Sequence, residues 1–230
     1  MNRSKETVLN ERMIVRTLAR KLETRNRLLG EEHEQYLGKV LTHVTPAKSP
    51  KIYSILRDLY GGIAPPLQPD IDILFRNNED IRAVEVKVFK ITGEGRLSRS
   101  YYEGIDQALA LLMLGFNRVA LWHIFDRNVG IKWFARHGSS LQLFIREQLK
   151  LPIDFTALYL IRSKKDYDFV PTKPIVDNFQ TMNLVDVRLL RKIEDPELPF
   201  LWKTSNPLMR YPHIMNVRKA ILEWLDIRDG

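Results

Sequence analysis

The chain has 230 residues, of which 44% are hydrophobic and 28% charged, a composition typical of a globular protein with a substantial core. It contains no cysteine, which excludes disulfides, cysteine nucleophiles and cysteine-ligated metal clusters. Its net charge of +8 favours a polyanionic partner, chiefly nucleic acid, although a basic solvated surface has the same balance.

The sequence shows no pattern of a membrane span or a signal peptide. The longest apolar run, residues 108–116, is less than half of the ~20 residues that a transmembrane helix needs. The first residues, MNRSKETVLNERMIVR, are charged throughout and lack an apolar signal-peptide core. We therefore expect a cytoplasmic protein without a membrane partner.

Residues 1–29 are predicted to hold a basic N-terminal helix, with the helical spacing clearest over 5–29. Apolar and basic residues alternate there at helical spacing. Arg12, Arg16 and Arg20 follow one another at intervals of four and so share one face. That face could lie along phosphates, or it could simply be the solvated side of an amphipathic helix.

Residues 30–163 are predicted to form the core. The expected helices are 30–44, 49–62, 98–115 and 138–150, and the expected strands are about 69–76, 80–90, 116–125 and 155–163. A helix between two apolar strands implies a crossover and hence a partly parallel sheet. The predicted fold class is therefore α/β, with a mixed central sheet flanked by helices.

Residues 164–230 are predicted to form a less regular C-terminal extension, rich in proline, that ends in an amphipathic helix at 213–227. The apolar face of this helix could make a homodimer or pack on its own domain, and we favour packing on its own domain. The chain shows no internal repeat.

Four charged residues fall inside the two strands of PDIDILFRNNEDIRAVEVKVFK (69–90). Because strand side chains alternate between faces, Asp70 and Asp72 share one face of the first strand, and Glu85 and Lys87 share one face of the second. RNNED is a turn sequence, so the strands are expected to form an antiparallel hairpin.

The length of the turn decides which of these side chains meet. A loop from Asn77 to Asp80 places Asp72 opposite Glu85 and Asp70 opposite Lys87, whereas a tight turn at Asn77-Asn78 places Asp70 opposite Glu85. In either register an acid of the first strand lies across from Glu85, close enough to bind one Mg²⁺ with it.

In that arrangement Lys87 points at the phosphate or the attacking water, and the remaining acid is a supporting or second-metal ligand. The alternative is structural: two cross-strand ion pairs on a solvated face. Apolar neighbours on both faces favour the metal site, because buried charges are costly unless they pair or bind an ion.

The run Pro69-Asp70-Ile71-Asp72, followed by Glu85-Val86-Lys87, resembles the signature of the PD-(D/E)XK, or restriction-endonuclease-like, nucleases. The resemblance covers about residues 30–125. It implies a restriction-endonuclease-like core and Mg²⁺-dependent (or Mn²⁺-dependent) cleavage of DNA phosphodiester bonds.

The resemblance also suggests supporting residues. Gln107 matches a site-facing helix glutamine of several branches, although Leu111 stands where those branches often carry tyrosine. A helix acid before the hairpin is a metal ligand in some members, and among Glu31, Glu32 and Glu34 we favour Glu34. A plain helix N-terminus rich in acids is the alternative.

Candidate DNA contacts follow the second strand and are Arg96, Arg99, Tyr101 and Tyr102. A simple surface loop is the alternative for the two arginines. The sequence thus predicts a metal-dependent DNA endonuclease with Asp70, Asp72, Glu85, Lys87 and Gln107 at its site. The rival is a catalytically inactive module of the same fold that serves in DNA binding or protein assembly.

Overall fold

The computed structural model describes residues 11–20, 38–65, 68–126, 128–162, 167–171 and 204–229. Its helices are α1 (Glu11–Arg20), α3 (Pro50–Leu59), α4 (Ile105–Met113), α5 (Ile131–Leu143) and α7 (Pro212–Asp229). Its strands are β1 (Lys39–Val44), β2 (Ile71–Asn77), β3 (Asp80–Phe89), β4 (Arg118–Phe125), β5 (Asp154–Arg162) and β6 (Tyr167–Pro171). Short helical turns lie at Pro46–Lys48, Phe144–Gln148 and Pro207–Arg210.

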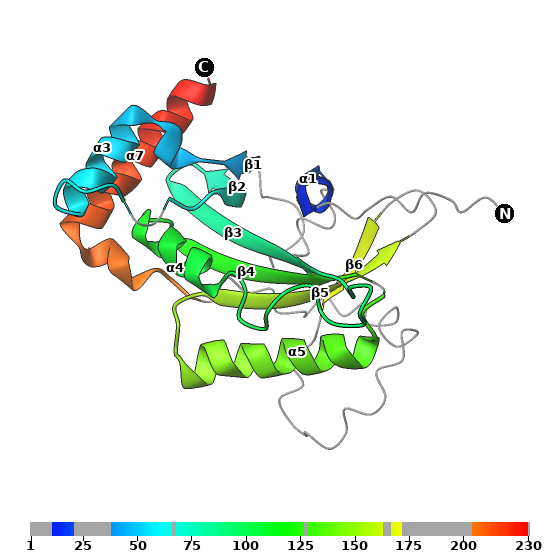
Figure 1. Cartoon of the computed structure of the whole chain (residues 1–230). Helices are drawn as coiled ribbons and strands as arrows, with labels where there is room; N and C mark the ends of the chain where they lie inside the picture. Colours follow the sequence, from blue (N-terminus) through cyan, green and yellow to red (C-terminus); the bar gives the residue numbers. More distant parts are fainter. Residues whose placement is uncertain are drawn as a thin grey trace.

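The six strands form one sheet in the order β1-β2-β3-β4-β5-β6 (Figure 1). Strands β3, β4 and β5 run parallel, and the other three neighbouring pairs are antiparallel. The predicted α/β class with a mixed sheet and flanking helices is therefore confirmed. None of the described helices combines the length and apolar character needed to cross a membrane.

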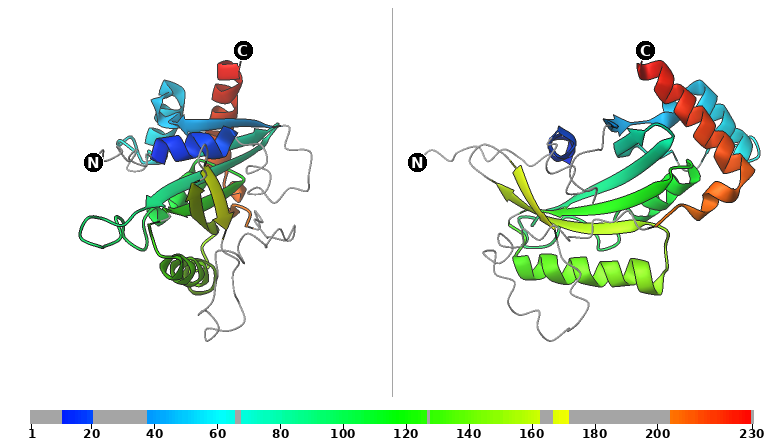
Figure 2. Two further views of the ribbon diagram at one scale, coloured as in Figure 1. Left: turned by 90° about the vertical axis from the view of Figure 1, so that its right-hand side faces the viewer. Right: turned by 180° about the vertical axis from the view of Figure 1, so that it is seen from behind.

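The sheet is covered on both faces, because alternate residues of its central strands are apolar on each side. Val84, Val86 and Val88 of β3 pack with Ile14 and other apolar residues of α1. The residues that alternate with these valines, such as Ala83 and Phe89, face α4 and α5, which lie on the other side of the sheet in Figures 1 and 2. The charged pair of β3, Glu85 and Lys87, belongs to this second face.

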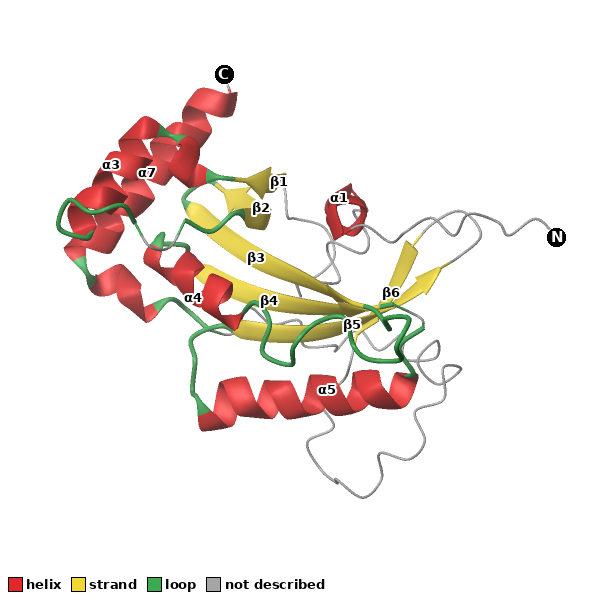
Figure 3. Ribbon diagram, viewed as in Figure 1, coloured by secondary structure: helices red, strands yellow, loops and turns green. Residues whose placement is uncertain are grey.

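Helices α3 and α7 pack together at one end of the sheet (Figure 3). Val217, Ile221 and Leu225 of α7 share one apolar cluster with the sheet. The buried Arg218 donates to the carbonyl of Gly115 and the side chain of Asn117, and it also contacts the carbonyl of Glu79 in the β2–β3 turn. The predicted C-terminal helix is thus confirmed, and it packs on its own domain.

Some predicted elements were wrong. Residues 30–44 were expected to be helical, but 39–44 form the edge strand β1, and 30–37 lie outside the described residues. The alternating β-branched residues Val40, Thr42 and Val44 favour a strand once β2 is available as a partner. Helix α5 begins at Ile131, seven residues before the predicted start, and β6 was not predicted.

Candidate active site

The β2–β3 hairpin sets the register of the candidate site. Asn77 pairs with Asp80, so the turn consists of Asn78 and Glu79, and Asn78 has a positive φ of 52°. Pairing then continues to Ile73–Val84. Of the two registers open to the sequence, this is the one that places Asp72 opposite Glu85.

Beyond Ile73 and Val84 the ladder between β2 and β3 stops, and a side chain takes its place. The carboxylate of Asp72 accepts a hydrogen bond from the Val86 backbone N–H, at 2.8 Å from Oδ2. Strand β2 instead keeps its partner on the other side, where Ile71 pairs with Val44 of β1. The two strands therefore separate at Asp72, and the Asp72 carboxylate accepts the hydrogen bond that a β2 carbonyl would otherwise accept.

Glu85 and Lys87 form a buried ion pair on β3. Only 2% of Glu85 and 8% of Lys87 are exposed, and Lys87 Nζ lies 2.5 Å from Glu85 Oε1. Their neighbours on the same face, Ala83 and Phe89, are fully buried. A pair in such surroundings is the opposite of the solvated surface pair considered as the structural alternative.

The electrostatics of the site oppose full ionisation of its acids. Burial and, after it, the charge of the Asp72 carboxylate raise the pKa of Glu85 to about 8, against the opposing effect of Lys87. Burial also raises the pKa of Asp72, to about 6, against the hydrogen bond from Val86. Like charges placed this way are relieved by a proton or by a bound cation.

Glu11 is a third acid at this edge, and sequence reasoning did not find it. Its Oε2 lies 3.2 Å from the Val88 backbone nitrogen and 2.8 Å from Arg99 Nη2, and its charge raises the pKa of Asp72. Glu11 precedes Ile14, Val15 and Leu18 at helical spacing. An acid on the apolar face of the N-terminal helix was the signal that could have found it.

His43 is a second residue that sequence reasoning missed. It lies on β1 with a positive φ of 53°, and its Nδ1 is 3.8 Å from Oδ1 of Asp72. Burial lowers the pKa of His43, so the imidazole is neutral at neutral pH. This places an imidazole beside the Asp72 oxygen that does not bond to Val86.

Asp70 lies at the rim of the site. It is exposed just before β2, and its Oδ1 accepts a hydrogen bond from the Thr45 hydroxyl at 2.6 Å. Its charge adds to the raised pKa of Asp72. Asp72 therefore occupies the central position and Asp70 a supporting one.

The remaining predicted residues differ in how far they are exposed. Gln107 is exposed on α4, Arg96 is exposed in the loop after β3, and Tyr102 is 56% exposed. Tyr101 is partly buried, and its hydroxyl donates to the carbonyl of His137 at 3.0 Å. Glu34, the favoured helix acid, lies outside the described residues.

The Arg99 side chain makes contacts within the protein. Its guanidinium donates to the carbonyl of Val88 at 3.1 Å and forms ion pairs with Glu11 and Glu103. These contacts join α1, the open edge of β3 and the segment before α4. Arg99 therefore supports the edge of the site in addition to any role in DNA contact.

A donor set for a cation is present without a preformed cage. Among the described residues, no three histidine, aspartate or glutamate side chains form a metal-binding group. Asp72 and Glu11 each direct an oxygen at a β3 backbone N–H, and Glu85 directs one at Lys87. Carboxylate oxygens are the ligands that Mg²⁺ prefers, so Asp72 and Glu85 are the residues that fit it here.

Two histidines are buried behind Lys87. His123 and His137 contact each other at 2.9 Å, between Nδ1 and Nε2. Burial, followed by His137 and the charges of Lys87 and Arg99, lowers the pKa of His123 to about 3, and burial lowers the pKa of His137 to about 4. Both imidazoles are therefore neutral at neutral pH.

This pair predicts acid sensitivity. Unfolded histidines titrate near 6.5, so below that pH the unfolded chain binds protons that the folded pair excludes. The pair's contribution to stability is present above pH 6.5 and is lost as pH falls towards about 4. Asp72 and Glu85, whose pKa values are raised, act in the opposite direction over the same range. The loss is therefore measured as a difference between proteins: in urea unfolding at pH 5 and 7, His137→Phe should remove its part of the acid-induced loss that the wild type shows. His213→Gln, at an exposed position, should leave it unchanged.

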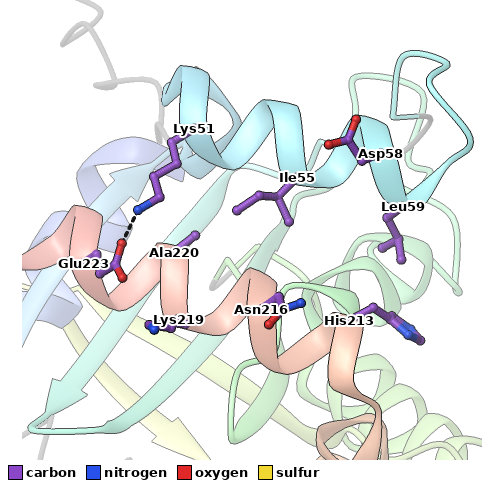
Figure 4. Close-up of a pocket in the computed structure, with 9 residues that line it drawn as sticks. All are labelled: Lys51, Ile55, Asp58, Leu59, His213, Asn216, Lys219, Ala220 and Glu223. Carbon is purple, nitrogen blue, oxygen red and sulfur yellow. Dashed lines mark hydrogen bonds and ion pairs between the residues drawn. The ribbon is translucent and has the colours of Figure 1, made fainter.

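A groove in the described part of the chain lies away from these residues. It is an open groove of about 710 Å³ between α3 and α7, with Ile55, Leu59 and Ala220 on its apolar walls (Figure 4). Lys51 and Glu223 form an ion pair across it. None of the candidate site residues lines this groove, so it is separate from the chemistry of β3.

Comparisons with known proteins give no relative for this chain. No protein-family model matches it, and neither the curated proteins nor the solved structures contain a match.

Proposed function

We propose that the protein is a metal-dependent nuclease that hydrolyses DNA phosphodiester bonds, in the manner of the PD-(D/E)XK endonucleases that its sequence resembles. The observation that carries the proposal is the open end of the hairpin, just beyond the Ile73–Val84 pair, where the Asp72 carboxylate bonds to Val86 and acts on the pKa of Glu85, and where Lys87 Nζ is 2.5 Å from Glu85 Oε1. This is an acid pair and a cation held by neighbouring strands in a site where full ionisation is unfavourable.

Asp72 and Glu85 are the residues that would hold Mg²⁺ or Mn²⁺. Bound there, the ion would polarise the scissile phosphate and lower the pKa of a coordinated water. Asp72 retains one oxygen for this purpose, because only its Oδ2 is used by Val86. Glu85 likewise has a second oxygen beside the one that contacts Lys87.

Lys87 supplies the positive charge of the protein itself. Its ammonium would turn from Glu85 to a non-bridging phosphate oxygen, where negative charge grows as the attacking water bonds to phosphorus. The low exposure of the site strengthens this interaction, because little water competes for the ammonium. Glu11 and Asp70 would hold the edge around the reacting groups.

DNA is the proposed substrate because the chain is basic as a whole and basic side chains lie near the site. The net charge is +8, and Arg12 and Arg16 are exposed on α1, the helix that carries Glu11. Arg96 is exposed in the loop that follows β3. Such residues contact phosphates irrespective of sequence, so we expect affinity for DNA to fall steeply with salt.

A second candidate function is a nuclease fold that binds DNA or assembles with proteins without cleaving. The observation that favours it is the mutual satisfaction of the charged groups: Lys87 pairs with Glu85, and Asp72 bonds to Val86. In that case the site would be a structural network with no need of a cation.

Plasmid cleavage by the full chain separates the two functions. We expect nicking of supercoiled plasmid in Mg²⁺ or Mn²⁺ and none in EDTA. Calorimetry should also show that the metal ion binds to the protein in the absence of DNA. Binding of DNA without cleavage and without metal binding would instead support the second function.

A further inference from the structure

We infer that the buried pair His123 and His137 positions Lys87, acting through the turn at Glu103 and Gly104. This inference rests on the proposed function, in which Lys87 acts on the phosphate. Within the described residues, the two histidines bond to each other and to the Glu103 carbonyl and not to Asp72 or Glu85, so we assign them a positioning and not a catalytic role.

The hydrogen bonds of the pair have a defined direction. His123 Nε2 lies 2.9 Å from the carbonyl oxygen of Glu103, which can only accept, so this nitrogen carries the proton. A neutral imidazole has one donor and one acceptor, so Nδ1 of His123 accepts from Nε2 of His137. The chain of donors runs from His137 through His123 to the Glu103 carbonyl.

The far end of this chain is enclosed. Nδ1 of His137 is buried and has no hydrogen-bond partner among the described residues. Aromatic rings surround the imidazole, with ring centroids 4.1 Å away for Tyr101, 4.8 Å for Phe125 and 5.0 Å for Phe89. The packing of the rings therefore fixes His137, and His137 in turn orients His123.

The other end of the chain reaches the stem of Lys87. Gly104 follows Glu103 directly and has a positive φ of 86°. A Cβ built on Gly104 would lie 3.0 Å from Cγ and 3.1 Å from Cε of Lys87, and 2.9 Å from Cδ1 of Leu121. Only glycine leaves room here, so the backbone of the turn itself packs over the lysine stem.

The sheet brings the two ends together. His123 of β4 is the register partner of Lys87 of β3, so the imidazole and the lysine stem are neighbours. The carbonyl held by His123 and the glycine that covers Lys87 belong to adjacent residues. A shift of the Glu103 carbonyl therefore moves Gly104 and frees the Lys87 stem to take another rotamer.

The side chain of Glu103 holds the same turn from outside. It pairs with Arg99 at 3.1 Å and accepts from the Ser100 hydroxyl at 3.3 Å. These contacts are partly exposed, whereas the His123 contact anchors the backbone from the core. We therefore expect loss of the His123 bond to loosen the position of Lys87 while the turn stays in place.

Three variants test this role. His123→Phe keeps a ring but removes the donor, His123→Gln keeps an amide donor that can reach the Glu103 carbonyl, and Gly104→Ala presses directly on Lys87. We expect the first and third to lower kcat for plasmid cleavage about 100-fold, the scale of a misplaced catalytic group. His123→Gln should restore most of the rate, and KM and Mg²⁺ affinity should stay close to those of the wild type in all three.

A second readout does not depend on cleavage. The ¹⁵Nζ resonance of Lys87, assigned by its loss in Lys87→Arg, should shift in His123→Phe and in Gly104→Ala but not in His123→Gln. If no protein cleaves DNA, the proposed function fails while this resonance still tests the positioning. An unshifted resonance in both disruptive variants, or equal losses of rate in His123→Phe and His123→Gln, would overturn the inference.

Discussion

Lys87→Met should lower the single-turnover rate of plasmid cleavage by about 100- to 1,000-fold, the cost of removing one charge-stabilising donor from an enclosed site. Methionine has a similar length and leaves the apolar contacts of the stem, so the loss isolates the ammonium. Glu85→Gln should reduce the rate at least as much, because it removes both a metal ligand and the partner of Lys87.

The control for these variants is Lys48→Met, which removes the same charge from an exposed position. It should cleave at the wild-type rate, and circular dichroism should show the same fold in all four proteins. Wild-type rates in Lys87→Met and Glu85→Gln, with sensitivity to EDTA retained, would show that the catalytic centre lies elsewhere in the molecule.

The hairpin was predictable because its information is local. Alternation places Asp72 and Glu85 on one face, and the turn sequence between them leaves only two sensible registers. The structure selects between these through the Asn77–Asp80 pair. Parallel strands with helical crossovers could likewise be predicted from apolar runs, since each run is long enough to show its own period.

The site residues that the sequence did not predict, Glu11 and His43, reach the site through contacts between distant segments. Glu11 meets Val88 only because α1 packs across the valine face of β3. His43 reaches Asp72 only because residues 39–44 form an edge strand in place of the predicted helix. Neither partner is encoded near the hairpin, so local patterns could not assign them.

The pairing of His123 with His137 has the same origin. Their sequence spacing suggests no metal site, and an apolar strand usually makes a histidine part of the core. Parallel pairing of β3 with β4 puts His123 beside Lys87, and the packing of α5 on the sheet brings in His137. His123 is therefore a core residue that is also a candidate positioning residue for Lys87.

Asp72→Asn should separate stability from metal binding. The asparagine oxygen can still accept from the Val86 N–H, but the variant removes a carboxylate whose charge raises the pKa of Glu85. In EDTA we expect the variant to be more stable than the wild type by about 0.5–2 kcal/mol, the usual gain when a strained functional group is relaxed. For a chain of this size that gain raises Tm by about 2–4 °C per kcal/mol.

Addition of Mg²⁺ should reverse the order of stability, so that the wild type becomes more stable than Asp72→Asn. A ligand that binds only the folded state stabilises it by about 2.7 kcal/mol at a concentration 100 times its Kd. We expect Mg²⁺ to give the wild type such a gain in urea unfolding and to give Asp72→Asn almost none. Asp70→Asn, at the rim, should keep most of the gain, because Asp70 is exposed and bonded to Thr45.

Two outcomes would count against this account. If Asp72→Asn were less stable than the wild type in EDTA, the charge of Asp72 would stabilise the fold through its attraction to Lys87, and its repulsion of Glu85 would be the smaller effect. If Mg²⁺ stabilised Asp72→Asn and the wild type equally, the ion would bind away from the open end of the hairpin. Since the hydrogen bond to Val86 survives the substitution, each result can be assigned to the charge of Asp72 alone.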